Sequence, residues 1–184
     1  MIASKNGVKW LYKLDKDKNP WNPKDEEGLW RPKNFVELNY DLECYDKKED
    51  GEDQLCLIAH RDGSFTIKKE YAWNGCTPKF GFFDILIGTP DGVVHKVTGK
   101  PKAYYATMIH DSLYQFIPVM PDDVPLTRKV ADAFFLELLE REEFILRWIY
   151  WLAVRIFGSI AMRGRKSVTR KTNGYVIKIP PKSK

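Results

Sequence analysis

The sequence predicts an α+β fold, in which a small antiparallel sheet is followed by two or three packed helices carrying a His-Asp/Asp constellation. Three short strand-like runs lie in the first half of the chain and are separated by turn-rich breaks. Apolar residues at helical spacing then dominate from about position 102 onward. The length of 184 residues suits one domain with a sizeable core, and the 43% hydrophobic content is typical of a globular protein.

Three regions are expected along the chain. Residues 1–34 are dense in charge, proline and tryptophan without a clear period, which predicts an irregular arm. A single α+β domain is expected over 35–162, and a basic tail over 163–184.

The strands are expected at 35–45, 54–59 and 64–69, with turn-forming residues between them. Apolar and polar residues alternate imperfectly, so the pattern does not fix the register. Residues 71–101 contain repeated glycine and proline turn formers, which predicts a loop region with room for one short strand or turn of helix.

The first helix is expected within 102–117, where helical spacing is broken by the proline-containing stretch that follows. Thr127 is the expected N-cap of the second helix, with Leu126 as the preceding apolar residue. This helix is expected to run to about Glu142, and then to continue or restart through 144–160.

The apolar segment 144–158 has two interpretations. A membrane span needs ~20 apolar residues, and an arginine near its centre costs about 2.5–3.5 kcal/mol, so Arg147 and Arg155 argue against one. We favour a core helix that packs on the sheet and on the helix of His110, because a compact domain must cover those faces. The alternative is an amphipathic helix on a membrane surface, anchored by Trp148 and Trp151 beside the basic tail.

Charge is distributed unevenly. From Arg163 onward the chain has eight basic and no acidic residues, so its net charge of +5 leaves about −3 for the remainder. A basic end indicates a surface contact with anionic lipid, nucleic acid or an acidic protein, while a solvated terminus is the simpler alternative.

The cysteines and the first residues bear on location. Cys44, Cys56 and Cys76 are odd in number and lack metal-like spacing, which favours a reducing compartment over a disulfide framework. The first residues lack the apolar run of a secretory signal, which indicates cytoplasmic synthesis. The sequence has no Walker loop, dinucleotide fingerprint, zinc cluster or Gly-x-Ser-x-Gly elbow.

The candidate site is the run His110-Asp111-Ser112-Leu113-Tyr114 together with Asp132. On a helix, His110 and Tyr114 share a face, while Asp111 points about 100° away. Asp132 lies on the next helix, and antiparallel packing would bring it to the histidine ring, where it would fix the tautomer. A buried structural histidine is the plainer alternative. Asp111 would be left to bind a hard cation such as calcium.

These motifs resemble, in order and spacing, a family of small, mostly phage- or prophage-encoded domains of unknown function. That family carries a glycine-proline loop, a His-Asp-x-Leu-Tyr helix, an Arg-x-x-Ala-Asp helix and an apolar helix that ends near a glycine. The matching segments here are 73–78, 110–114, 128–134 and 153–158, and the resemblance spans roughly residues 65–160.

The two helices also resemble, more distantly, the His-Asp phospholipases that cleave the sn-2 ester, especially the short bacterial and parvoviral forms. This resemblance implies that His110 is the base that activates a water and that Asp132 orients it. It implies that Tyr114 donates a hydrogen bond to Asp132.

Calcium is the one cofactor that this second resemblance implies. Asp111 would be a ligand, and Asn74 and Gly75 hold part of the calcium loop found in those enzymes. In the phage family an acidic residue occupies the position of Asn74.

We therefore expect a phage-type protein with a phospholipase-like His/Asp hydrolytic site that acts at an anionic membrane surface. The alternative is a non-enzymatic phage protein that binds a host or virion protein, in which the His-Asp-Tyr network locks two helices together. Nucleic-acid binding through the tail is the weakest of the three. The expected location is the cytoplasm, of the host if the protein is phage-encoded, with a peripheral membrane or virion position as variants. The oligomeric state is left open.

Overall fold

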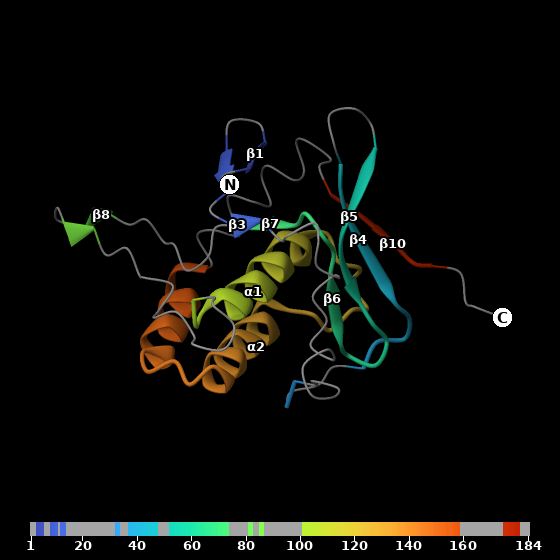
Figure 1. The fold of residues 1–184 in the computed structure, drawn as a ribbon. Coiled ribbons are helices and arrows are strands. Elements are labelled where there is room, and N and C mark those ends of the chain that lie inside the picture. Colours follow the sequence, from blue (N-terminus) through green and yellow to red (C-terminus); the bar gives the residue numbers. More distant parts are fainter. Residues whose placement is uncertain are drawn as a thin grey trace.

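The computed structural model describes residues 3–5, 8–10, 12–13, 32–33, 37–47, 52–73, 81–82, 85–86, 101–158 and 175–180. Their fold is α+β, as the sequence predicts. A four-stranded antiparallel sheet lies on one side and the helices lie on the other (Figure 1).

The main sheet has the strand order β10-β4-β5-β6, and each neighbouring pair is antiparallel. Its strands are β4 (Leu42–Lys47), β5 (Asp53–Ala59), β6 (Phe65–Ile67) and β10 (Tyr175–Lys178). The strand expected at 35–45 is correct only for its last part. Residues 39–40 form a bend, and the Asp41 carboxylate accepts a hydrogen bond from the Arg61 backbone at 2.6 Å.

Strand β10 comes from the segment expected to be a basic tail. It pairs with β4, so that Val176 lies opposite Tyr45 and Ile177 opposite Cys44. The Lys178 Nζ lies 3.0 Å from an Asp53 carboxylate oxygen, which ties β10 across β4 to the start of β5.

Short strands also occur in the regions expected to be irregular. The N-terminal part contains a hairpin of β1 (Ala3–Lys5) and β2 (Val8–Trp10), followed by β3 (Tyr12–Lys13). Strand β3 pairs with β7 (Ala72–Trp73), and β8 (Gly81–Phe82) pairs with β9 (Ile85–Leu86).

The two long helices lie where the sequence predicts them. Helix α1 (Tyr104–Phe116) runs into a short 3-10 turn, η1 (Ile117–Val119), which has a proline in its first turn. Helix α2 (Arg128–Arg141) begins after Thr127, whose hydroxyl accepts a hydrogen bond from the Val130 backbone at 3.4 Å. The expected N-cap is confirmed.

The chain breaks after α2 and restarts as a helix over 147–158. Glu143 has a φ of 51°, in the left-handed region, and its N–H donates to the Glu140 carbonyl. The Phe144 N–H donates to the Leu139 carbonyl at 2.9 Å. This pair of bonds is the Schellman ending of a helix, and the buried Phe144 is its usual apolar follower.

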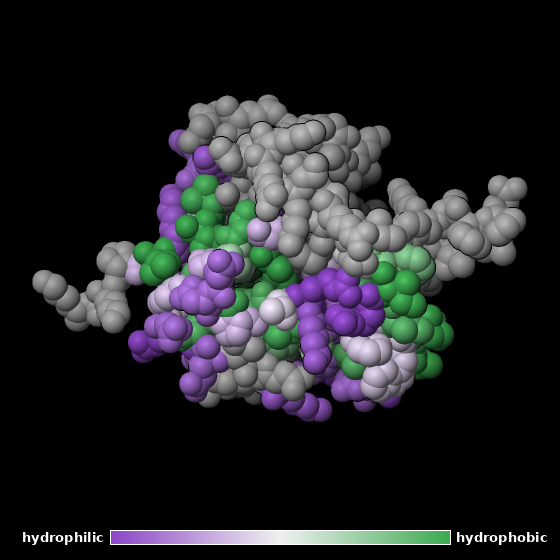
Figure 2. All heavy atoms as spheres, turned by 180° about the vertical axis from the view of Figure 1, so that it is seen from behind, coloured by the Kyte–Doolittle hydropathy of each residue, from purple (hydrophilic) through white to green (hydrophobic). Residues whose placement is uncertain are grey.

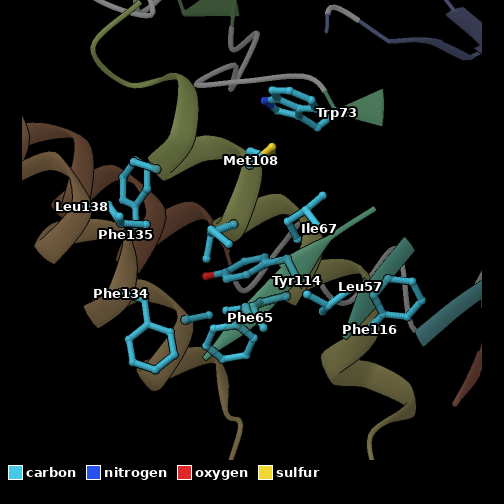
Figure 3. Close-up of a cluster of buried hydrophobic side chains, with 14 of the residues drawn as sticks. Leu57, Phe65, Ile67, Trp73, Met108, Tyr114, Phe116, Phe134, Phe135 and Leu138 are labelled. Atoms are coloured by element: carbon cyan, nitrogen blue, oxygen red, sulfur yellow. The ribbon is translucent and has the colours of Figure 1, made fainter. Parts of the chain in front are cut away.

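The core lies between the sheet and the two long helices. Figure 3 shows Leu57, Phe65 and Ile67 from the sheet facing side chains of α1 and α2. The rings of Phe65 and Phe134 lie 5.6 Å apart and join β6 to α2. Tyr114 lies among these side chains with its hydroxyl turned toward α2 (Figure 3).

The favoured expectation placed the helical segment 147–158 on the sheet and on the helix of His110. It contacts that helix, where Gly158 lies against Tyr114, but it does not pack on the sheet (Figure 1). It lies beyond α1 and α2, on the side away from the sheet (Figure 1). One face packs inward through Tyr150 and Gly158, both buried, while several large apolar residues on the other face are exposed. Among the described residues, no helix has the length and apolar character needed to cross a bilayer.

Candidate functional site

A buried carboxylate, Asp132, is the centre of a polar cluster between the helices. Its side chain is about 1% exposed. Two donors approach its Oδ1 atom: His110 Nε2 at 3.0 Å and the Tyr114 hydroxyl at 2.5 Å. Two arginines approach its Oδ2 atom, Arg155 Nη1 at 2.7 Å and Arg128 Nε at 3.8 Å. The cluster therefore joins α1, α2 and the helical segment 147–158.

The surrounding donors keep Asp132 ionised. Burial raises the pKa of its carboxyl, but hydrogen bonds from His110, Tyr114 and Arg155 outweigh burial and leave the pKa below its ordinary value. An ionised carboxylate only accepts hydrogen bonds, so Tyr114 must donate and His110 Nε2 must carry a proton. When the imidazole is neutral, its free lone pair is therefore on Nδ1. The tautomer follows from this network.

The imidazole of His110 is held tightly and is only 6% exposed. Its ring centre lies 4.1 Å from that of Tyr114 and 4.9 Å from that of Phe135. The Nδ1 atom faces Asp111 Oδ1 at 3.8 Å. Burial lowers the pKa of His110, but Asp111 and Asp132 together outweigh burial and leave the pKa above its ordinary value.

Helical spacing explains how the sequence places these groups. His110 and Tyr114 are four residues apart on α1, share a face, and reach the same carboxylate oxygen, as expected. Asp111 projects from a different part of α1 and is partly exposed. The structure thus brings His110, Tyr114 and Asp132 together, with Asp111 on the outer side of the imidazole.

Of the three residues expected to bind calcium, the structure describes only Asp111. Asn74 and Gly75 lie outside the described residues. Within the described ranges, no three His, Cys, Asp or Glu side chains gather as metal ligands would. Asp111 offers one carboxylate there, whereas calcium takes 6–8 oxygen ligands.

Three members of the cluster were not among the expected site residues. Arg128 is four residues before Asp132 on α2, a spacing that favours an ion pair, and its Nη2 also donates to the Arg155 carbonyl at 2.9 Å. Arg155 is one of two charged residues, with Arg147, in the otherwise apolar segment 144–158, a pattern that indicates polar contacts on one face of the helix. Gly158 lies so close to Tyr114 that a Cβ atom there would be 2.5 Å from the Tyr114 hydroxyl oxygen.

The cluster has the chemistry of an oriented base. A carboxylate fixes the imidazole, and the nitrogen that remains can accept a proton. The same contacts also fasten three helices together. No family model, curated protein or solved structure matches this chain. A function can therefore be inferred only from the cluster itself.

Proposed function

We propose that this chain is a phospholipase-like ester hydrolase of the phage type, with His110 as its general base. One observation carries the proposal. The Nε2 atom of His110 is bound by an ionised carboxylate at 3.0 Å, while Nδ1 is turned away from Asp132 toward the partly exposed Asp111. This is the orientation that a base needs to accept a proton from water.

The reaction would proceed through Nδ1. A water gives its proton to Nδ1 as its oxygen attacks the ester carbonyl, and the imidazolium then returns that proton to the departing alkoxide. The products are an alcohol and a carboxylic acid, which then releases its proton to water. Asp132 stays ionised throughout and stabilises the imidazolium. If calcium is bound, Asp111 would be one of its ligands and the ion would supply positive charge to the reaction.

The test is hydrolysis of mixed phospholipid vesicles by the full chain, with calcium and with a chelator. We expect ester cleavage that falls at least about 100-fold in His110→Gln, the size of a lost general base. His60→Gln is the matched control, because His60 is partly exposed and bonds to Thr66, away from the cluster. Equal cleavage by the wild type and a folded His110→Gln variant would overturn the proposal, as would a wild type that cleaves no ester.

A second candidate is a non-enzymatic protein that binds a host or virion partner. It is favoured by the ion pair between Arg155 and Asp132, whose atoms lie 2.7 Å apart. The guanidinium partly neutralises the carboxylate, which therefore stabilises an imidazolium at His110 less strongly. Buried, fully bonded polar networks also specify how helices pack. A wild type without cleavage, combined with a marked loss of stability in His110→Gln, would support this candidate over the hydrolase.

A further inference from the structure

The helical segment 147–158 turns its apolar side chains outward. Ile149 is 63% exposed, Leu152 52% and Ile156 54%. With Trp148, which is also exposed, these residues recur every three or four positions and form what we call the outer stripe. Figure 2 shows apolar side chains gathered on the right-hand side, where this segment lies.

The inner face of the same segment is apolar in part, with the buried Tyr150 and the partly buried Val154, but it also carries a charge. Arg155 reaches inward to Asp132, and Gly158 lies against Tyr114. A helix in water ordinarily buries its apolar stripe and exposes its charges. Here Arg155 is held inward by Asp132 while the outer stripe is exposed, and an exposed apolar stripe of this kind is typical of a contact surface.

Charge favours an anionic partner. From position 144 to the end, the sequence has ten basic residues and no acidic one, and two of the ten, Arg155 and Lys178, are paired with Asp132 and Asp53. A second copy of the chain on the outer stripe would bring two such segments together, and like charges oppose that contact. An anionic surface would attract them instead.

Tryptophan favours a lipid surface in particular. The ring of Trp148, in the outer stripe, meets that of Trp151 edge to face at a centroid distance of 6.1 Å. Indole rings are enriched at the level of lipid headgroups, where an apolar ring and a polar N–H are both accommodated. Leucine and isoleucine of an interfacial helix lie deeper, among the first carbons of the acyl chains.

We propose that the segment 147–158 lies flat on an anionic phospholipid surface, with the outer stripe in the acyl boundary, and that the basic character of the sequence from 147 onward attracts it there. The proposal does not depend on the hydrolytic activity of His110. It is a contact at the interface and not a span.

The test is vesicle flotation of the full chain, with phosphatidylcholine alone and with phosphatidylcholine mixed with phosphatidylglycerol. We expect binding to the mixed vesicles and at least about 10-fold weaker binding when Ile149→Ser and Leu152→Ser are combined. Ile179→Ser is the matched control, because Ile179 is 53% exposed, lies in the same cationic region and is outside the helix. This control should bind as the wild type does.

Three outcomes would overturn the proposal. The first is no binding to either vesicle. The second is binding that the paired substitution leaves unchanged and that high salt abolishes, because the basic residues alone would then hold the chain. The third is a wild type that is dimeric without lipid and becomes monomeric in the paired variant, because the outer stripe would then join two copies.

Discussion

At the residue scale, the cluster depends on one buried charge. A buried carboxylate is costly unless several donors satisfy it, and Asp132 has His110, Tyr114 and Arg155 within 3.0 Å. We expect Asp132→Asn to lower the free energy of unfolding by about 3–5 kcal/mol, because it leaves Arg155 without its anion and turns an amide N–H toward other donors.

Urea denaturation of Asp132→Asn and Asp123→Asn measures this difference. Asp123 is an exposed carboxylate that accepts a hydrogen bond from the Tyr40 hydroxyl at 2.8 Å, so it matches the chemistry without the burial. Its substitution should have a clearly smaller effect. Equal losses in the two variants would contradict the view that Asp132 holds the helices together.

A second residue-scale prediction concerns Gly158. Glycine to alanine inside a helix ordinarily stabilises a protein by roughly 0.5–1 kcal/mol. At Gly158 we expect the opposite sign, a loss of about 1–3 kcal/mol, because the new Cβ would lie 2.5 Å from the Tyr114 hydroxyl oxygen.

The double variant with Tyr114→Phe isolates that contact. Removal of the hydroxyl takes away the nearest atom, although ring carbons remain at 3.0 and 3.1 Å, so part of the Gly158→Ala loss should be recovered in a double-mutant cycle. Strictly additive losses would show that Gly158 does not depend on the Tyr114 hydroxyl.

At the element scale, the left-handed turn at Glu143 ends α2 and separates it from the helical segment 147–158. A non-glycine residue in the left-handed region costs roughly 1–2 kcal/mol, and Glu143 adopts a φ of 51° to end α2. We expect Glu143→Gly to stabilise the protein by about 1 kcal/mol in thermal or urea unfolding. Glu142→Gly is the control and should destabilise, because Glu142 has a φ of −80°. A Glu143→Gly variant less stable than the wild type would contradict this account of the turn.

The helices show what local sequence can and cannot specify. The start of α2 was predictable because Thr127 carries its capping hydroxyl in the sequence itself. The end of α2 was also predicted to within one residue, at about Glu142. Whether the helix continues or restarts after that point was left open, because the left-handed residue is glutamate and no glycine marks the break. His110 and Tyr114 were predictable as neighbours from their spacing, but the Arg155 contact depends on a turn at Glu143 that the sequence does not signal.

At the scale of the whole molecule, pairing between distant segments was beyond the sequence pattern. Strand β10 pairs with β4 across more than a hundred intervening residues, and its four residues lie in basic surroundings that resemble a tail. Likewise β3, at residues 12–13, pairs with β7, at residues 72–73. Such pairs are two to four residues long, and only the assembled core selects them, so short periodic patterns cannot identify them.

The cluster also makes the stability of the whole molecule depend on pH. Folding raises the pKa of His110, so its contribution is complete below the ordinary value of 6.5 and is lost as pH rises through the folded-state pKa. Folding lowers the pKa of Asp132, so its contribution is complete above 3.8 and is lost as pH falls through the lowered value. Their joint contribution is therefore greatest between about 3.8 and 6.5.

We expect the free energy of unfolding of the wild type to fall as pH rises from below 6.5 to well above it, by about 1.4 kcal/mol for each unit by which folding raises the pKa of His110. His110→Gln has no proton to lose in this range, so its urea-unfolding curves should change less with pH. If the protein is a hydrolase, the neutral imidazole that catalysis needs forms only as this stability is lost, and cleavage should increase over the same interval. If the free energy of unfolding changed with pH equally in the wild type and in His110→Gln, the prediction would be wrong. The contacts to Asp111 and Asp132 would then not raise the pKa of His110 in the folded protein.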